Sequence, residues 1–208
     1  MYRGKLDIIP CTLYTLPSTQ MTRIALFASG SGSNVENIAN YFANNDQVVF
    51  TKVYCNKPDA FVLQRAAKLG LATRIFTKEE FSGSETIVQE LLDDQTDLII
   101  LAGFLWMVPA ALVKAFPKHI INIHPALLPK FGGKGMYGMR VHEAVVANKE
   151  TESGITIHYV NEHYDEGPAI FQAKFEVLPT DSADDVAHKI HLLEFEHFPK
   201  IIEKLVKN

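Results

Sequence analysis

Short apolar runs alternate with segments of helical periodicity along the first part of the chain. Predicted strands occupy residues 24–28, 48–54, 73–76, 98–102 and 120–123. Predicted helices occupy residues 34–44, 59–69, 84–94 and 109–116. Strands and helices that alternate in this way predict an α/β fold: a Rossmann-like, mostly parallel sheet with helices on both faces.

The pattern changes after residue 150. The segments "ITIHYV" (155–160) and "AIFQAKFEV" (169–177), joined by a polar loop, predict an antiparallel strand pair added to the sheet at its C-terminal end. A final helix is expected from about Ser182, because Asp184 and Asp185 favour a helix N-terminus. Pro199 is expected to bend that helix.

Composition is typical of one globular domain in a reducing compartment. The 208 residues are 47% hydrophobic and 21% charged, carry a net charge of −4 without long runs of one sign, and include two cysteines. These values predict no nucleic-acid or membrane partner and a cytoplasmic location. We expect a single domain over residues 21–208. Residues 1–20 are either an extension outside the core or follow a start codon assigned too early, since Met21 directly precedes the first strand.

A glycine-rich turn, "ASGSGSN", follows the first strand and opens a helix at Asn34. Its backbone N–H groups and the hydroxyls of Ser31 and Ser33 form a candidate anion site, although a tight strand-to-helix connection has the same pattern. The dinucleotide fingerprint requires a third glycine where Val35 stands and an acid after the second strand, which is missing. A nicotinamide-dependent dehydrogenase is therefore disfavoured. The "GGKG" at 132–135 lacks the Walker spacing and gives no evidence for ATP.

The segment "LAGFLWMVP" (101–109) follows the fourth strand with a run of large apolar residues. Such residues usually belong to a core. Here they leave the same sheet edge as the glycine turn, where ligands bind in open α/β sheets. The segment is therefore also a candidate wall for a flat heteroaromatic ligand.

Two polar side chains interrupt the buried strand "IINIHPALLPKF" (120–131). Asn122 and His124 lie two residues apart, so in a strand they point to the same face, and Pro125 ends the strand directly after them. Asp165, in the loop "VNEHYDEGP" (160–168), is a candidate third group. An amide, an imidazole and a carboxylate together are suited to stabilising an oxyanion and moving protons.

Three further histidines are assigned no chemistry. His142, His158 and His163 are expected to be buried with satisfied hydrogen bonds or to lie on the surface. No pair of histidines has a metal-binding spacing together with an acid, so no metal is predicted.

Five segments, taken in order, resemble the folate-dependent formyltransferase family over residues 22–202. These segments are "FASGSGSN", "LAGF", "INIHPALLPKF", "SGITIHYVNEHYDEGPAI" and "LLEFEHFP". Within this family, the glycine turn followed by a glutamate near the C-terminus resembles the pattern of the members that act on glycinamide ribonucleotide. The resemblance implies the formyltransferase fold and transfer of a formyl group from 10-formyltetrahydrofolate, a co-substrate, to the amine of glycinamide ribonucleotide in de novo purine biosynthesis. Direct attack through a tetrahedral intermediate, and a monomer or weak homodimer, are implied as well.

The resemblance also implies roles for individual residues. Asn122 and a protonated His124 would hold the oxyanion, and Asp165 would assist the histidine and the proton transfer. The residues implied for the ribonucleotide are Gly32, Ser33 and Asn34 at the phosphate and His191 and Glu194 at the ribose. The residues implied for the folate are Leu105, Trp106, Met107, Val108, Asn122, Asn161, Glu162, His163, Tyr164 and Asp165.

Two departures from familiar members concern the folate pocket and a loop. Trp106 stands where those members carry an arginine, and "GGKGMYGMRVHEAV" (132–145) is longer and is expected to form a loop over the cleft. The alternatives are a sister transferase or hydrolase of the same fold and a non-catalytic folate- or nucleotide-binding protein. The sister enzymes typically carry an extra domain, for which 208 residues leave no room.

Overall fold

A computed structural model of the chain describes residues 21–83 and 85–206. The predicted extension, residues 1–20, lies outside this part of the chain. The strands are β1 (Thr22–Ala28), β2 (Val48–Cys55), β3 (Thr73–Ile75), β4 (Leu98–Leu101), β5 (Ile120–His124), β6 (Glu152–Tyr159) and β7 (Ala169–Glu176). The helices are α1 (Ser33–Tyr41), α2 (Val62–Lys68), α3 (Lys78–Gly83), α4 (Glu85–Asp93), α5 (Ala110–Ala115), α6 (Met139–Ala147) and α7 (Ala183–Val206).

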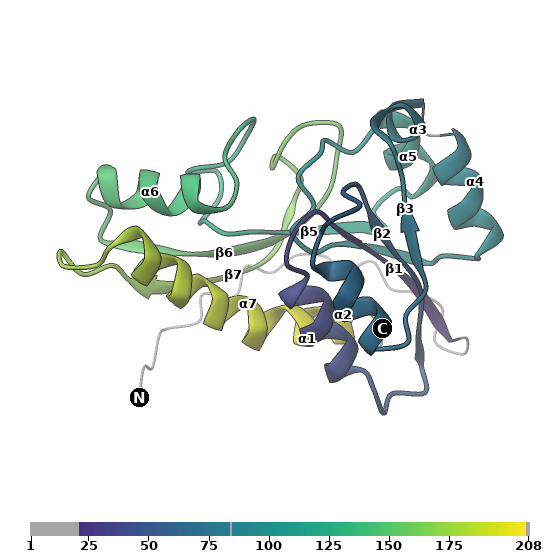
Figure 1. Ribbon diagram of the computed structural model, residues 1–208. Coiled ribbons are helices and arrows are strands. Elements are labelled where there is room, and N and C mark those ends of the chain that lie inside the picture. The colour runs from purple at the N-terminus through teal and green to yellow at the C-terminus, as the bar shows by residue number, and fades with distance from the viewer. Residues whose placement is uncertain (1–20, 84, 207–208) are drawn as a thin grey trace.

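The seven strands form one sheet in the order β3-β2-β1-β4-β5-β6-β7 (Figure 1). The first five of them pair in parallel. β6 and β7 join the edge next to β5 as antiparallel strands. The predicted α/β fold, with its mostly parallel sheet and C-terminal antiparallel pair, is confirmed.

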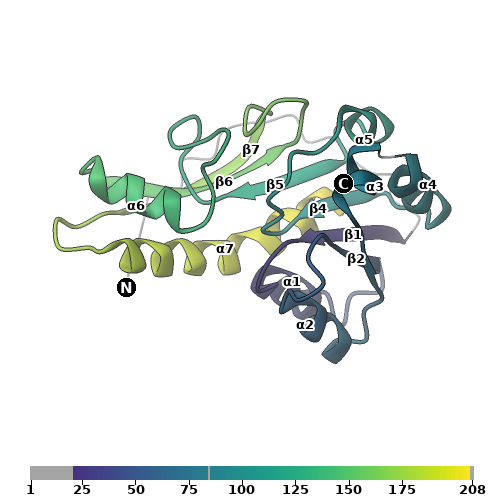
Figure 2. The ribbon, with the colours of Figure 1, turned by 45° about the horizontal axis from the view of Figure 1, so that its top comes forward.

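Helices cover both faces of the sheet because its central strands are apolar on both sides. In β1, Ile24 and Leu26 face one layer, where they pack with residues of α1, α2 and α7. Ala25 and Phe27 face the other, where they pack with residues of α3, α4 and α5. This explains why the strands read as continuous apolar runs. Figure 2 shows α6 beside α7, with which it is in contact.

The order of the strands reverses between β1 and β4. The chain moves outward from β1 to β2 and β3, then returns to β4 on the other side of β1. The segments that leave β1 and β4 are tied together by two hydrogen bonds: Ser29 N–H donates to the Gly103 carbonyl (3.1 Å), and Leu105 N–H donates to Ser29 Oγ (3.0 Å). A crevice outside the carboxyl ends of such strands is the usual ligand site of this architecture.

The C-terminal helix begins where its polar residues predict. Ser182 and Asp185 form a reciprocal cap: Asp185 N–H donates to Ser182 Oγ (3.2 Å), and Ser182 N–H donates to Asp185 Oδ2 (2.9 Å). The helix then continues through Pro199 to Val206 as one element. Two helices were not predicted. α3 is short, and α6 begins inside the segment that was expected to be a loop, so that expectation was wrong from Met139 onward.

Within residues 21–83 and 85–206, no helix combines the length and the hydropathy that a membrane span requires.

Gly32 is the point at which the glycine turn packs against the fold. It has a φ of 73°, and a Cβ there would lie 2.8 Å from the Val62 Cα and closer still to the Val62 side chain. Val62 N–H donates to the Gly30 carbonyl (3.1 Å), so α2 holds the turn in place. Gly30, in contrast, has open space around a built Cβ and no positive φ.

Gly32→Ala should therefore lower the melting temperature, whereas Gly30→Ala should leave it nearly unchanged. The left-handed backbone alone costs a non-glycine residue roughly 1–3 kcal/mol, and the contact with Val62 adds to this. Thermal unfolding of the two variants checks the prediction. Equal melting temperatures would show that the turn adjusts without cost.

Burial lowers the pKa of three histidines below the ordinary value of 6.5: His142 in α6, His158 in β6 and His197 in α7. Desolvation is the largest cause for each, since burial disfavours the charged imidazolium. The unfolded chain therefore binds protons first as the pH falls. Their contribution to the free energy of unfolding is complete above about pH 6.5 and declines below it.

His197→Phe should make the free energy of unfolding fall less steeply between pH 7 and pH 5. The phenyl ring keeps the contact with Phe171, whose ring centroid lies 4.9 Å from that of His197, but it does not titrate. His188→Gln, at an exposed position of the same helix, is the control for replacing a histidine of α7 and should leave the free energy of unfolding at pH 7 nearly unchanged. Denaturant titrations across this pH range measure both. An unchanged slope for His197→Phe would contradict the prediction.

Candidate active site

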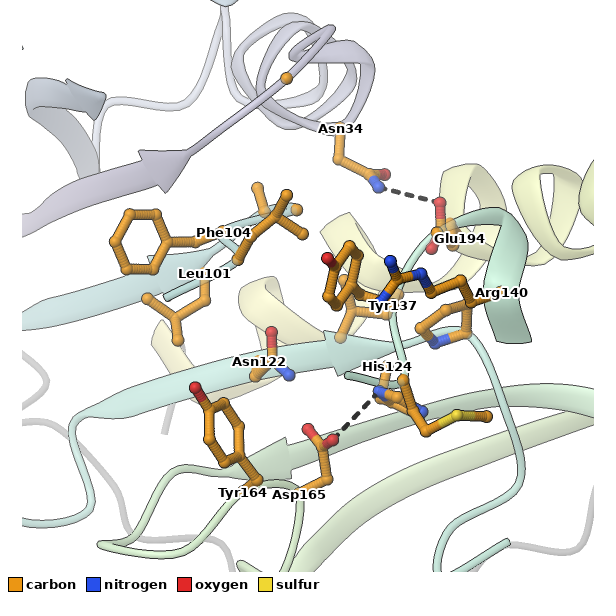
Figure 3. Close-up of a pocket in the computed structure, with 18 of the residues that line it drawn as sticks. Asn34, Leu101, Phe104, Asn122, His124, Tyr137, Arg140, Tyr164, Asp165 and Glu194 are labelled. Atoms are coloured by element: carbon orange, nitrogen blue, oxygen red, sulfur yellow. Dashed lines mark hydrogen bonds and ion pairs between the residues drawn. The ribbon is translucent and has the colours of Figure 1, made fainter. Parts of the chain in front are cut away.

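A pocket of about 920 Å³ lies at the carboxyl edge of the central strands (Figure 3). The glycine turn of residues 30–34 and helix α7 form one end of it, and residues 101–108 form another wall. β5 supplies its floor, and residues 133–140 and the loop around residues 160–165 complete it. Five of the predicted site segments thus meet in one cavity: the glycine turn, residues 105–108, β5, the loop around residues 160–165 and α7.

His124 and Asp165 face each other in this pocket. His124 is 4% exposed, and its Nδ1 lies 3.5 Å from Asp165 Oδ2. Its Nε2 lies 2.8 Å from the Phe131 carbonyl oxygen, which can only accept a hydrogen bond, so Nε2 carries a hydrogen. A second proton, on Nδ1, would point at the carboxylate. The imidazole is thus fixed at both nitrogens.

The backbone also positions the Asp165 carboxylate. Gly133 N–H donates to Asp165 Oδ2 (2.9 Å), and the residue itself has a φ of 55°. Its other oxygen, Oδ1, lies 3.7 Å from His158 Nε2. The predicted carboxylate therefore lies between two imidazoles, next to the start of the glycine-rich segment.

His158 was assigned no chemistry from the sequence, and the structure brings it into the site. It lies opposite Asn122 in the β5–β6 register, and Asn122 Nδ2 lies 3.1 Å from its Nε2. His158 Nδ1 is 3.0 Å from the Tyr159 carbonyl oxygen and must donate to it, so a neutral ring accepts the Asn122 hydrogen at Nε2. The lowered pKa of His158 agrees with this neutral form. His158 thereby orients the Asn122 amide.

The alternation of side chains along β6 was the one sequence signal that could have identified His158 as a site residue. In "ITIHYV" it is the one imidazole in a buried strand, as His124 is in β5. Only the pairing of the two strands shows that it faces Asn122.

Asn34, His191 and Glu194 meet at the other end of the pocket. Asn34 Nδ2 donates to Glu194 Oε2 (2.9 Å), and His191 Nδ1 lies 3.3 Å from the same oxygen. Asn34 is 8% exposed, and its Oδ1 has no hydrogen-bond partner among the residues that the structure describes. The sequence predicted all three residues here. Their contacts bring α1 and α7 together around a polar surface.

The wall of residues 105–108 belongs to both the pocket and the core. Trp106 lines the pocket and packs at ring-centroid distances of 5.9 Å from Phe76 and Phe81. Val108 is buried, whereas Leu105 and Met107 are exposed. The two readings of this segment, core or pocket, are therefore both correct.

The predicted folate residues of the second loop are placed unequally. Asn161, His163, Tyr164 and Asp165 line the pocket, and Glu162 is exposed outside its lining. Among residues 21–83 and 85–206, no group of three or more acids, histidines or cysteines is arranged to hold a metal ion.

Comparison with known proteins agrees with this geometry. The formyl transferase family profile matches residues 22–202. A chloroplastic phosphoribosylglycinamide formyltransferase of Arabidopsis thaliana is 38% identical over 198 residues, which cover 89% of this chain and 67% of the plant protein. The phosphoribosylglycinamide formyltransferase of Escherichia coli K12 is 33% identical, covering 86% of this chain and 84% of that protein.

Solved structures show the same relationship. The crystal structure of phosphoribosylglycinamide formyltransferase from Streptococcus pneumoniae TIGR4 superposes with a TM-score of 0.79 at 34% identity, covering 89% of this chain and 99% of that one. The resemblance seen in the five sequence segments is thus confirmed over almost the whole described chain. This chain belongs to the formyl transferase family, among the phosphoribosylglycinamide formyltransferases.

Proposed function

We propose that this chain transfers the formyl group of 10-formyltetrahydrofolate to the amine of glycinamide ribonucleotide, a step of de novo purine biosynthesis, and that Asn122, His124 and Asp165 are its catalytic residues. The observation that carries the assignment is the convergence of these three side chains in the middle of the pocket (Figure 3). They lie between the Asn34–Glu194 end and the apolar wall, where a nucleotide and a folate would meet. The names of the similar proteins support the reaction.

The chemistry requires hydrogen-bond donors at one atom and proton transfer at another. As the amine attacks the formyl carbon, a C–N bond forms, the formyl oxygen becomes negative and the attacking nitrogen becomes positive. The intermediate collapses by breaking the bond from that carbon to N10 of the folate. The proton lost by the amine is finally carried by N10, which leaves as a neutral amine. Donors aimed at the oxygen, and a group that relays the proton, therefore accelerate both steps.

Asn122 and His124 supply the donors in this proposal. His158 holds one hydrogen of the Asn122 amide and leaves the second for the formyl oxygen. His124 Nε2–H exchanges the Phe131 carbonyl for that oxygen, while Nδ1 stays opposite Asp165. Asp165 stabilises the imidazolium electrostatically and receives the amine proton through water. The Gly133 bond keeps its carboxylate in the required position.

The two substrates occupy opposite ends of the pocket. The phosphate of the ribonucleotide binds the turn of Gly32, Ser33 and Asn34 at the start of α1. The ribose hydroxyls donate to Glu194, whose two protein contacts both use Oε2 and leave Oε1 for the sugar, with His191 beside it. The pterin packs along residues 105–108 and 161–165.

Two small molecules are the proposed partners, and a cytoplasmic monomer or weak homodimer is the proposed form. The names of plant relatives specify the chloroplast, so compartment differs within the family. Formyl transfer, followed spectrophotometrically with the purified chain and both substrates, tests the reaction. Tight binding of both without turnover would instead identify a non-catalytic binding protein.

Asp165→Asn and His124→Ala should each lower kcat by a factor on the order of a hundred or more. The first keeps the shape of the side chain but removes the charge that faces His124 Nδ1, and the second removes a donor to the oxyanion. Steady-state kinetics of both variants measure the effect, with KM values changing much less. Near wild-type turnover of Asp165→Asn would mean that another acid carries the role, with Glu162 and Glu166 in the same loop as the next candidates.

The double variant should be far less impaired than the product of the two single effects, because both groups act on one transition state. The kcat values of the wild type, the two single variants and the double variant form a double-mutant cycle that measures this. Independent, fully additive effects would contradict a shared role.

Trp106→Ala should raise the KM for the folate roughly two- to tenfold, which corresponds to the energy of one ring contact. The KM for the ribonucleotide should stay close to that of the wild type. Because the ring also packs on Phe76 and Phe81, the variant should lose roughly 0.5–3 kcal/mol of stability. Trp106→Phe is the matched control and should retain most of both properties. A loss of stability with an unchanged folate KM would assign Trp106 to the core alone.

A further inference from the structure

Every permanently cationic side chain in the pocket lining comes from one segment. Among the described residues that line the pocket, these are Lys134 and Arg140, and both belong to the glycine-rich stretch of residues 132–140. The proposed substrates carry their negative charges on a phosphate and on the carboxylates of the folate. The positions of these two cations therefore help to decide which of them would bind the phosphate and which the carboxylates of the folate.

The guanidinium of Arg140 is free to bind an anion. Its Cζ lies 5.1 Å from the centroid of the Tyr137 ring, a cation–π contact that holds the side chain without using its N–H groups. Within residues 21–83 and 85–206, it has no carboxylate partner, and both residues are exposed toward the pocket. A planar guanidinium with free donors matches the geometry of a phosphate, to which it can bind with two parallel hydrogen bonds.

Among the residues that the structure describes, no lysine or arginine side chain is free to bind an anion at the glycine turn. Arg65, on the neighbouring helix α2, pairs with Glu36 and donates from Nε to the Ser31 carbonyl (3.0 Å). The turn itself offers only backbone N–H groups, hydroxyls and the Asn34 amide. A doubly charged phosphate bound there would be neutralised only in part.

Arg140 and Lys134 start from different places along the pocket wall. Figure 3 shows Arg140 and Tyr137 extending into the cavity, and Arg140 belongs to α6, which packs against α7, the helix that carries Glu194. Lys134 follows Gly133, whose N–H donates to Asp165 Oδ2 in the middle of the pocket. Gly138, with a φ of 55°, directly precedes helix α6 and separates it from the glycine-rich stretch, so Arg140 lies in the first turn of that helix.

A second observation on the same helix supports a polar ligand at this end. His142, two residues after Arg140, lines the pocket and is 6% exposed. Its Nδ1 is buried without a hydrogen-bond partner among the described residues. Unpaired buried polar atoms are uncommon in folded proteins, and one that lies beside a cavity is suited to contact a bound molecule.

We propose that Arg140 is a specificity-determining residue, which reaches across the pocket from α6, braced by Tyr137, and binds the phosphate of the ribonucleotide substrate held in the glycine turn. The inference rests on the proposed function, since it assumes that the phosphorylated substrate occupies the end of the pocket near Asn34. Arg140 thereby distinguishes the ribonucleotide from its unphosphorylated counterpart.

The test is a titration by calorimetry of glycinamide ribonucleotide, and of the same compound without its phosphate, into wild type, Arg140→Gln, Arg140→Lys and Lys134→Gln. Arg140→Gln should weaken binding of the phosphorylated compound about tenfold or more and leave the unphosphorylated one unchanged. Arg140→Lys should fall between, because it keeps the charge and loses the planar fork. Lys134→Gln is the matched control from the same segment and should bind both compounds as the wild type does. Circular dichroism and melting temperatures confirm that each variant is folded.

Two results would overturn the inference. One is equal affinity of Arg140→Gln and wild type for the ribonucleotide, and the other is a rise in KM for the folate alone, which would assign Arg140 to the second substrate. These outcomes are separable from failure of the proposed function. A wild type that transfers formyl groups while Arg140→Gln binds the ribonucleotide normally refutes the inference alone. A wild type without turnover, whose Arg140→Gln variant still loses affinity for the phosphorylated compound alone, refutes the reaction and keeps the role of Arg140.

Discussion

The arrangement of the site depends on one carboxylate held between two imidazoles. Asp165 is almost enclosed, faces His124 at 3.5 Å and His158 at 3.7 Å, and is fixed by the backbone N–H of Gly133. His158, which faces this carboxylate, is also the hydrogen-bond partner of Asn122. Gly133, which donates to the carboxylate, belongs to the segment that leads to Arg140. Strand pairing sets the positions of the two histidines, and a loop supplies the charge. Any movement of that loop therefore displaces the proposed catalytic carboxylate and its contact with the glycine-rich segment together.

The hydrophobic pattern of the sequence was sufficient to predict the architecture, because the sheet is buried on both faces. Apolar runs such as "LII" in β4 identify the strand whatever lies above or below it, and the capping residues Ser182 and Asp185 mark the start of α7. α6 was missed for a physical reason. Its N-terminal half contains methionine, arginine and histidine facing a pocket, so the apolar stripe that identifies a surface helix is interrupted by the residues that face the ligand.

The residues of the candidate site also fall into two groups: those that the sequence predicted and those that it did not. Asn122 and His124 were predictable because strand alternation is local, and Asp165 was a candidate from its polar loop. The resemblance to the family supplied the role of Asp165 and the choice of Glu194. His158 and Arg140 were not predictable from local pattern. The first faces Asn122 because of the β5–β6 register, and the second reaches the pocket because of the way α6 packs on α7. The period of a strand or helix shows which face a side chain lies on, but only long-range pairing shows what it meets there.

The hydrogen bond between Asn34 and Glu194 joins residues 160 positions apart, on the first and the last helices. A chain emerging from the ribosome therefore carries its glycine turn long before the acid that completes that end of the pocket. Domains assemble cooperatively as the chain becomes available, and here α7 must dock before the turn acquires its partner. An unfinished chain thus contains β5 with Asn122 and His124 but lacks α7, and with it the Glu194 end of the pocket.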